Sequence, residues 1–523
     1  MKLNIFFNKE NWFIVFLFLF SLFFNQHYGN RGIFPVDSFA HFDSGFRILL
    51  GDHPFRDYWI VSGPFVDYLQ ATFFYIFGVN WQSYVLHASL INAILTITTF
   101  LILKKFNLNN YYSFIYSLFF SILAYPSSGT PFVDHHSAFF SLLGIYSLIM
   151  GIQSKKKIYW ILIPILFGFA FLSKQVPSIY VIISVILILI FFLFLKKDNY
   201  WIKYLIFSSI LFIFLLLAFG WIQGISLSSF IEQYILYPQT IRNLRVQNFS
   251  FNLISFLGHF KFIFLSIIPL FFINFKKLIL EKNYIKQNNF FYFLILLSFT
   301  FSLIFHQILT KNQTFIFFLI PLLMAFSHIS LNSYQFKFKK IVSIILISLV
   351  LLITFKYHLR FNENRKFHEL NQVNFKSSIN GAEIDKKFNG LKWITPAYKN
   401  NVQEELILIK KIKSFLINDS RSKMLISNYS FFSGLLNQNL HSPSRWYLSD
   451  GTDYPLRNNK YFNSYKNLVI KLIQNNKIEV IYVVYPLDDR VIYDYLDKSC
   501  FRESKKLNKL KSYELKNCEE ING

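Results

Sequence analysis

The residues best suited to chemistry lie together near the N-terminus, between residues 35 and 78. Five aspartates occur in this stretch: Asp37, Asp43, Asp52, Asp57 and Asp67. Two histidines and two arginines accompany them: His41, His53, Arg47 and Arg56. A carboxylate can take a proton from a hydroxyl group, and a cation beside it can bind an anionic substrate. Long apolar runs lie on both sides, so this charged loop is expected to be held at a membrane surface.

A second group of candidates surrounds Asp134, which stands just before an apolar run in the sequence TPFVDHHSAFF. His135 and His136 follow it, so a carboxylate and two imidazoles are expected at the outer boundary of the membrane. Asp134 is a candidate catalytic residue, and His135 is a candidate for substrate binding. A solvated turn explains the two histidines equally well, and an acid in this position can also cap a helix.

Basic residues on the same side are few, and each is a candidate for binding the phosphate of an anionic lipid. In the first loop, Arg56 and its neighbour Asp57 are candidates for substrate binding. The others are Lys174, Arg242, Arg245 and Lys311 in short loops, and Lys261 within an apolar run, where it either snorkels outward or faces an internal cavity. General attraction to anionic headgroups explains any one of these lysines and arginines equally well.

The composition places the chain among polytopic membrane proteins. Of its 523 residues 54% are hydrophobic and only 15% are charged, which is too apolar for a soluble protein of this length. About eleven apolar runs are candidates for membrane-spanning helices, the shorter ones with tilt. They cover residues 12–24, 83–103, 113–125, 138–151, 158–172, 176–195, 201–222, 251–275, 290–308, 315–331 and 341–355. No small-residue cleavage site follows the first run, so it is expected to remain as a helix.

Lysines in the loops between the runs predict the orientation of the chain. Alternate loops are rich in lysine, as at residues 155–157, and such loops face the cytoplasm. The charged loop at 35–78 is then expected to face outward. Because the number of runs is odd, the chain after residue 356 is expected outside the inner (plasma) membrane as well.

Two domains are therefore predicted. Residues 1–356 form an α-helical membrane domain with an outer loop at 28–81, and residues 357–523 form a small extracytoplasmic α/β domain. Within the second domain, helices are expected at 404–416 and 463–475, and strands at 423–427 and 480–484. Both cysteines of the chain, Cys500 and Cys518, fall there and are expected to form one disulfide.

Several motifs resemble those of a known enzyme family. The first loop begins PVDSFAHFDSG, continues with a G-D-x-P-F-x-D-Y segment, and ends in VSGPFVDYLQATFFYIFG. Asp134 before its span, the segment GFAFLSKQ, and the run from His306 to Pro321 with a Q-T-F-x-x-F-x-x-P pattern are further matches. Together they resemble the polyprenyl-phosphate-dependent membrane glycosyltransferases of the C-type fold, the aminoarabinose and protein-mannosyl transferase group.

This resemblance implies a lipid-linked sugar donor, an active site that faces outward, and Asp37 as the catalytic base. The family's Asp-Glu pair is here Asp37-Ser38, and its Lys-Pro-Pro segment is replaced by residues 62–64, Ser-Gly-Pro. The expected function is transfer of a hexosyl or pentosyl group, with inversion, from a polyprenyl-phosphate donor to a hydroxyl group of a glycolipid, polysaccharide or protein.

The chemistry of such a transfer agrees with the residues present. The phosphate is already a leaving group, so a carboxylate that deprotonates the acceptor and a few cations suffice. No glycine-rich nucleotide loop or Asp-x-Asp metal motif occurs, which predicts that no cofactor is required and leaves a bound divalent cation open. No nucleic-acid partner is expected, because the excess of basic residues serves membrane topology.

Two other function classes stay open at this stage. A surface-polysaccharide polymerase or ligase also uses polyprenyl-linked sugars, although its chemistry rests on basic residues in a late loop. A transporter of lipid-linked saccharides needs polar residues within its spans. For Asp37 itself, the alternative to a role as catalytic base is that it caps a helix that begins at Ser38.

Overall fold

The computed structural model describes the chain at residues 9–241, 252–310, 316–334, 338–448, 450–484, 490–507 and 509–518. The chain forms two compact units, each made of three segments. We call the first the helical unit; it comprises Met1–Asn30, Val85–Phe214 and Phe249–Gln372. We call the second the mixed unit; it comprises Arg31–Tyr84, Leu215–Asn248 and Val373–Gly523. The boundary predicted between residues 356 and 357 stays a prediction.

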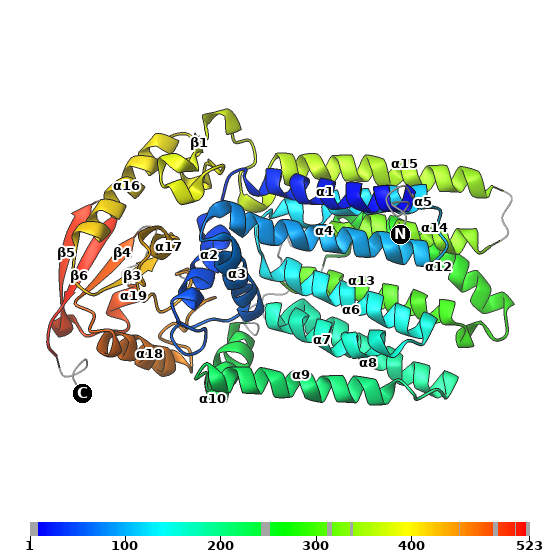
Figure 1. Ribbon diagram of the computed structural model, residues 1–523, viewed down its shortest axis with the longest axis horizontal. Coiled ribbons are helices and arrows are strands. Elements are labelled where there is room, and N and C mark those ends of the chain that lie inside the picture. The colour runs from blue at the N-terminus through cyan, green and yellow to red at the C-terminus, as the bar shows by residue number, and fades with distance from the viewer. Residues whose placement is uncertain are drawn as a thin grey trace, which may run out of the picture. The chain divides into compact units, whose positions relative to one another are not determined.

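Each of the eleven apolar runs coincides with a helix in the described part of the chain. These helices are α1 (Lys9–Gly29), α4 (Trp81–Lys105), α5 (Asn110–Leu123), α6 (Val133–Ser154), α7 (Lys157–Ser173), α8 (Gln175–Lys196), α9 (Ile202–Ile222), α12 (Leu253–Leu280), α13 (Asn288–Thr310), α14 (Leu319–Asn332) and α15 (Lys339–Tyr357). Those of the helical unit lie side by side (Figure 1). The predicted α-helical membrane fold is thereby confirmed.

Eight of the described helices are long and apolar enough to cross a bilayer: α1, α4, α6, α8, α9, α12, α13 and α15. A helix of 20 residues spans about 30 Å, the thickness of the hydrocarbon layer. The three remaining helices, α5, α7 and α14, have 14, 17 and 14 residues. At 1.5 Å per residue they measure about 21, 26 and 21 Å, and tilt would shorten their reach further, so a thinner bilayer or neighbouring structure must complete the crossing.

The segment that leads into α6 is held tightly within the helical unit. Gly129 has a φ of +74°, and a Cβ atom there would lie 2.6 Å from the backbone of Gly29. The fully buried Arg365 donates to the carbonyl oxygens of Pro126, Ser127 and Ser128 at 2.8, 3.1 and 2.9 Å. Glycine and arginine together fix the turn that sets where α6 begins.

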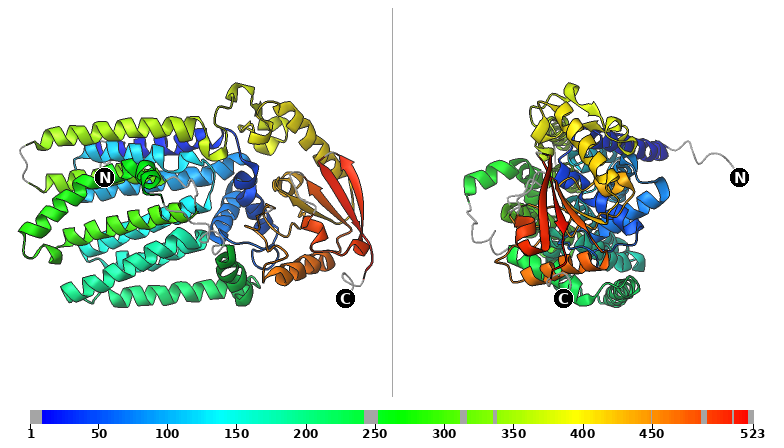
Figure 2. Two further views of the ribbon diagram at one scale, coloured as in Figure 1. Left: turned by 180° about the vertical axis from the view of Figure 1, so that it is seen from behind. Right: turned by 90° about the vertical axis from the view of Figure 1, so that its left-hand side faces the viewer.

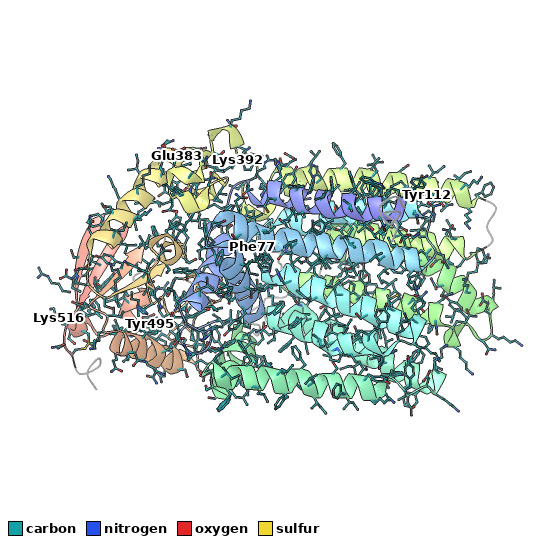
Figure 3. The ribbon with its side chains drawn as sticks, in the orientation of Figure 1. Phe77, Tyr112, Glu383, Lys392, Tyr495 and Lys516 are labelled. Carbon is teal, nitrogen blue, oxygen red and sulfur yellow. A yellow bond between two sulfur atoms is a disulfide. The ribbon has the colours of Figure 1, made fainter. Side chains whose placement is uncertain are left out.

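The mixed unit combines short helices with a four-stranded sheet. Its strands β3 (Lys423–Ser427), β4 (Val480–Val484), β5 (Phe501–Leu507) and β6 (Leu510–Leu515) are ordered β3-β4-β6-β5. Strands β3 and β4 pair in parallel, and the other pairs are antiparallel. Figure 2 shows β5 and β6 in red, next to one another. A separate pair joins β1 (Ile379–Asn380) to β2 (Lys392–Trp393), where Figure 3 labels Lys392.

The helices of the mixed unit come from all three of its segments. They are α2 (Pro35–Leu49), α3 (Pro64–Phe77), α10 (Leu227–Phe230), α16 (Val402–Asn418), α17 (Phe432–Leu436), α18 (Phe462–Asn475) and α19 (Arg490–Tyr493). The predicted helices near 404–416 and 463–475 and strands β3 and β4 are therefore confirmed. The hairpin of β5 and β6 was not predicted, because its outer strand FRESKKL carries charges that hide the strand pattern, as edge strands often do.

The predicted disulfide between Cys500 and Cys518 is confirmed. Cys500 comes directly before β5, and Cys518 follows the end of β6. The bridge therefore ties together the two outer ends of the hairpin.

Candidate functional site

In the helical unit, Asp134 is held between a lysine and a histidine. It lies in the first turn of α6 and is only 1% exposed. The Lys174 Nζ atom is 2.6 Å from its Oδ2 atom, and the His306 Nε2 atom is 3.1 Å from its Oδ1 atom. Both carboxylate oxygens therefore have a partner, so the buried charge of Asp134 is compensated.

Lys174 occupies the break between α7 and α8. Its backbone is extended, with φ −161° and ψ 135°. The hydroxyl groups of Ser178 and Ser137 donate to its carbonyl oxygen at 2.7 and 3.2 Å. These bonds fix the backbone of the break and leave the ammonium group to interact through its three donors. The sequence predicted Asp134 and Lys174 separately, and the structure brings them together.

His135 and His136 do not lie in a solvated turn, so that alternative is wrong. Both are buried on α6. The ring of His135 stacks on Tyr125, with ring centres 5.1 Å apart. His136 lies with its Nε2 atom 2.9 Å from Nε2 of His87, and the Tyr125 hydroxyl group contacts its Nδ1 atom at 2.5 Å. The apolar run after Asp134 continues the helix, which carries these rings into the packed interior.

In the mixed unit, Asp37 lies in the first turn of α2. This helix begins at Pro35, and its N-cap is Phe34, so Asp37 does not cap a helix that begins at Ser38. The Ser38 hydroxyl group instead accepts a hydrogen bond from the backbone N–H of Phe34 at 3.0 Å. Asp37 is half-buried. The positive end of the helix dipole favours a carboxylate at this place.

One turn after Asp37, His41 belongs to a buried ionic cluster that joins distant parts of the chain. Its Nδ1 atom lies 2.6 Å from Oδ1 of Asp67, which α3 supplies. The Arg445 Nη1 atom lies 3.3 Å from Oδ2 of the same aspartate, and its Nη2 atom donates to the carbonyl oxygen of Ser62. Burial lowers the pKa of His41, although the neighbouring Asp67 carboxylate raises it in part.

Two further buried acids lie near this cluster. Burial raises the pKa of Asp43 to about 6, against the lowering effect of the Arg47 guanidinium. Burial likewise raises the pKa of Asp453 to about 7, although Arg445 lowers it in part. The Asp453 Oδ2 atom accepts from the backbone N–H groups of Arg445 and Trp446 at 3.0 and 3.2 Å. Both carboxyl groups therefore hold a proton more readily than ordinary aspartates.

Arg56 and Asp57 form an ion pair, with Nη2 and Oδ2 atoms 2.7 Å apart. Arg56 also donates to the carbonyl oxygens of Gln223 and Gly51, each at 2.6 Å. Asp57 accepts from the backbone N–H of His53 at 2.7 Å. These contacts hold the loop together, and the predicted role of the pair in substrate binding stays a prediction.

Lys261 lies on α12, with its Nζ atom 5.3 Å from the centre of the Phe262 ring. The remaining candidate cations, Arg242, Arg245 and Lys311, lie outside the described residues. Among the residues that the structure describes, no group of three or more histidine, cysteine, aspartate or glutamate side chains is arranged to hold a metal ion.

Sequence reasoning missed Arg445 and Asp453, because nothing local distinguishes them from surface residues of the C-terminal segment. It noted His306 only as part of a motif. Arg445 follows Asp67 by 378 residues, and His306 follows Asp134 by 172. No local pattern contains these pairings.

A comparison with known protein families finds a match for part of the chain. Residues 52–222 match the family described as dolichyl-phosphate-mannose-protein mannosyltransferase. The chain is similar to the polyprenyl-phosphate-dependent membrane glycosyltransferases. The resemblance read from the motifs is thereby confirmed. The matched segment contains Asp57, Asp134 and Lys174.

Two solved structures are similar to the chain at low sequence identity. ArnT from Cupriavidus metallidurans in the apo state is 10% identical with a TM-score of 0.48, over 95% of this chain and 97% of that chain. The same protein bound to undecaprenyl phosphate is 8% identical with a TM-score of 0.49, over 97% and 98%. At these scores the likeness decides nothing about function. No curated protein matches the chain.

Proposed function

We propose that the chain is an integral membrane glycosyltransferase that acts on the outer face of the cytoplasmic membrane. It moves a hexosyl or pentosyl group from a polyprenyl-phosphate-linked donor to a hydroxyl group of a glycolipid, polysaccharide or protein. The match of residues 52–222 to the mannosyltransferase family carries this proposal. The apolar helices support it, since a donor with a long lipid tail stays in the bilayer.

Asp37 serves as the general base in this proposal. The acceptor oxygen forms a bond to the anomeric carbon while the bond from that carbon to the phosphate oxygen breaks. The acceptor proton passes to the Asp37 carboxylate, and polyprenyl phosphate departs. Attack from the face opposite the phosphate inverts the anomeric centre. The half-buried place of Asp37 in the first turn of α2 supports this role, because a base must be reachable by the acceptor.

Asp134 has a different role, as a positioning residue for Lys174. Its two oxygens are already engaged by Lys174 and His306, which makes it a poor acceptor for another proton. The Lys174 ammonium group has donors beyond the one that faces Asp134, and its side chain is 21% exposed. We assign to Lys174 the binding of the donor phosphate, whose negative charge grows as the sugar leaves.

The experiment that tests the function compares cells with and without the chain by mass spectrometry of their outer glycans and glycolipids. We expect that, in cells without the chain, one glycan or glycolipid lacks a single hexose or pentose that it carries in cells with the chain. Membranes that contain the chain should transfer the same sugar in vitro from a radiolabelled polyprenyl-phosphate donor. Unchanged glycans and no transfer in vitro would overturn the proposal. Accumulation of lipid-linked sugar on one side of the membrane, without transfer, would indicate a transporter instead.

A further inference from the structure

A group of basic residues in the helical unit takes no part in the contacts of Asp134 and Lys174. We call it the basic cluster; its members are His259, Lys261, Lys356, Arg360 and Lys366. The first two lie near the start of α12, and Lys356 lies at the end of α15. The last two follow α15, in η6 (His358–Glu363) and η7 (Lys366–His368). The fold therefore gathers cations from two separate segments of the chain.

Two lysines of the basic cluster reach the same aromatic ring. The Nζ atoms of Lys261 and Lys356 lie 5.3 and 5.2 Å from the centre of the Phe262 ring. A ring within about 6 Å attracts an ammonium group, which offsets part of the repulsion between the two lysines. Both lysines are exposed. The ring thus holds two positive charges near one another at the surface of the unit.

The arginine of the basic cluster lies over a neighbouring ring. The Arg360 guanidinium carbon is 5.2 Å from the centre of the Phe361 ring. Tyr357 connects this ring to that of Phe262, since its ring centre is 5.6 Å from the first and 5.8 Å from the second. Tyr357 and Phe361 are both buried. The cations therefore form two adjoining groups on one packed aromatic support.

No acid of the helical unit compensates these charges. The acidic residues of the unit all lie in its described part: Glu10, Asp134, Asp198, Glu281, Glu363 and Glu369. In that part of the chain, no acid forms an ion pair or a hydrogen bond with a member of the basic cluster. Arg360 and Lys366 both repel a positive charge on His259, and Arg360 repels Lys366. Three lysines and one arginine therefore stand within the unit without an opposite charge.

Exposed apolar side chains continue from the basic cluster along both helices. Ile268 lies two turns after Lys261 on α12, and Leu352 lies one turn before Lys356 on α15. Residues at these spacings share one face of a helix. In a bilayer, such side chains contact acyl chains, and a lysine near the end of a helix extends to the headgroups. The cluster is therefore placed where headgroups and acyl chains meet.

We propose that the basic cluster binds a phospholipid whose headgroup carries two phosphate groups, the chemistry of cardiolipin. One phosphate binds Lys261 and Lys356 at the Phe262 ring, and the other binds Arg360 and Lys366. The acyl chains lie along the exposed apolar side chains of α12 and α15. This site goes beyond the proposed sugar transfer. It also uses other helices than Lys174, which lies between α7 and α8.

Other anionic lipids use the basic cluster less fully. Phosphatidylglycerol and polyprenyl phosphate each carry one phosphate group, so one of the two groups of cations stays without a phosphate. General attraction of anionic headgroups acts on every exposed cation and depends on the total charge of the lipids. A comparison of lipids at equal phosphate concentration therefore separates a built site from general attraction.

The test measures lipid binding by the full-length protein, with no sugar donor and no transfer. Protein in detergent is mixed with cardiolipin, phosphatidylglycerol, phosphatidylcholine or polyprenyl phosphate at equal phosphate concentration, and native mass spectrometry counts the bound lipids. We expect cardiolipin to bind at least tenfold more tightly than each of the others. Lys356→Gln and Arg360→Gln should each weaken cardiolipin binding about fivefold, the factor that one basic residue contributes at a lipid surface. Lys356→Arg keeps the charge and should bind like the wild-type protein.

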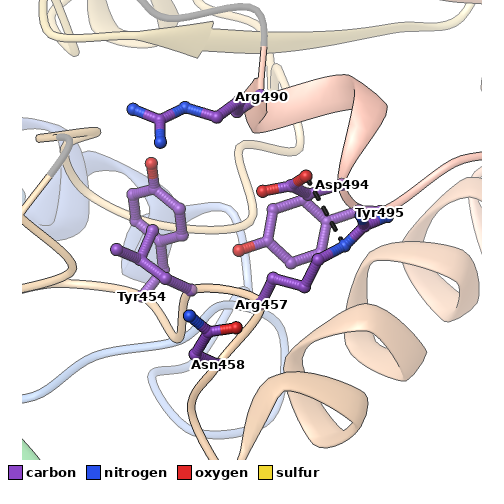
Figure 4. Close-up of a pocket in the computed structure, with 7 residues that line it drawn as sticks. Tyr454, Arg457, Asn458, Arg490, Asp494 and Tyr495 are labelled. Atoms are coloured by element: carbon purple, nitrogen blue, oxygen red, sulfur yellow. Dashed lines mark ion pairs between the residues drawn. The ribbon is translucent and has the colours of Figure 1, made fainter.

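Arg457→Gln is the matched control, because Arg457 is an exposed arginine of the mixed unit that already has an acidic partner. Its Nε atom lies 3.8 Å from Oδ1 of Asp494, the ion pair drawn in Figure 4. This variant should bind cardiolipin like the wild-type protein. The melting temperature of each variant without lipid should equal that of the wild-type protein, which separates loss of the site from unfolding.

Three results would overturn the proposal. Equal affinity for cardiolipin and phosphatidylglycerol would show attraction by total charge alone. Full cardiolipin binding by both Lys356→Gln and Arg360→Gln would place the lipid elsewhere. Polyprenyl phosphate that binds as tightly as cardiolipin and is lost in Lys356→Gln would make the cluster a site for the donor. Because no transfer is measured, a failure of the glycosyltransferase assay leaves these outcomes separate.

Discussion

Arg445 and Asp67 form an ion pair with an Nη1 to Oδ2 distance of 3.3 Å, and both side chains are fully buried. They are 378 residues apart in the chain. Asp67 also binds His41, which lies one turn after Asp37 on α2. The C-terminal segment of the mixed unit therefore supplies the charge that holds α2 and α3 together.

Removing the Arg445 charge should destabilise the protein strongly. Arg445→Met leaves Asp67 buried beside His41 without the arginine, and a buried pair that loses one partner costs about 3–5 kcal/mol. We expect a lower melting temperature in detergent for Arg445→Met and for Asp67→Asn. The double variant should lose less than the sum of the two, because the charges act as a unit. Strictly additive losses would show that the pair is not coupled. Arg502→Met, at an exposed arginine of β5, is the control and should melt like the wild-type protein.

Asp37→Asn should abolish turnover while the protein stays folded. The amide keeps the size of the side chain but cannot accept a proton, so a base role predicts a loss of about 10²–10⁴-fold in turnover. Protein amount and donor binding should stay at the wild-type level in membrane assays. Asp450→Asn, at an exposed acid of the mixed unit, serves as the control. Near-normal transfer by Asp37→Asn would remove the base assignment and direct the search to Asp57.

Lys174→Ala and Asp134→Asn should both weaken use of the donor. If Asp134 acts through Lys174, each variant raises the KM for the donor by about tenfold or more and leaves the KM for the acceptor unchanged. Lys157→Ala, at an exposed lysine that begins α7, should leave both constants unchanged. Equal effects on donor and acceptor would contradict a phosphate-binding role for Lys174.

The contribution of Asp43 to the stability of the mixed unit should decrease as the pH rises from about 4 to about 7. Burial raises the pKa of Asp43 from 3.8 to about 6, so the folded chain holds a proton that the unfolded chain releases. This contribution is complete below pH 3.8 and is lost as the pH rises through about 6. Asp43→Asn cannot titrate, so its melting temperature should fall less than that of the wild-type protein between pH 5 and pH 7.5. Parallel pH curves for the two proteins would contradict the raised pKa.

The outward location of the C-terminal segment is a prediction that topology reporters can test. Fusions after Lys157 or Lys197 should report the cytoplasm, and fusions after Lys399 should report the outside. The disulfide between Cys500 and Cys518 gives a second measurement, because thiol reagents without reductant should label neither cysteine. A cytoplasmic reporter signal after Lys399 would contradict the proposed orientation, and labelling of both cysteines would contradict an oxidising compartment.

The sequence by itself determined the membrane class, the helices and much of the C-terminal segment. Apolar runs must bury or face lipid, and in lipid a single segment satisfies its own backbone only as a helix. The same local logic predicted α16, α18, β3 and β4, since their hydrophobic periods are written in consecutive residues. It did not predict β5 and β6, whose charged residues conceal the strand pattern.

The partners of the buried charges were decided only by the tertiary structure. The sequence identified Asp134 and Lys174 as candidates, but it gave no sign that His306 completes the group or that Arg445 reaches Asp67. It also left open whether His135 and His136 are solvated. The structure shows that both are buried. A period of hydrophobic residues reports the burial of one segment, whereas a buried charge is stabilised by whichever opposite charge the folded chain brings to it. That choice depends on contacts across hundreds of residues, which no local pattern contains.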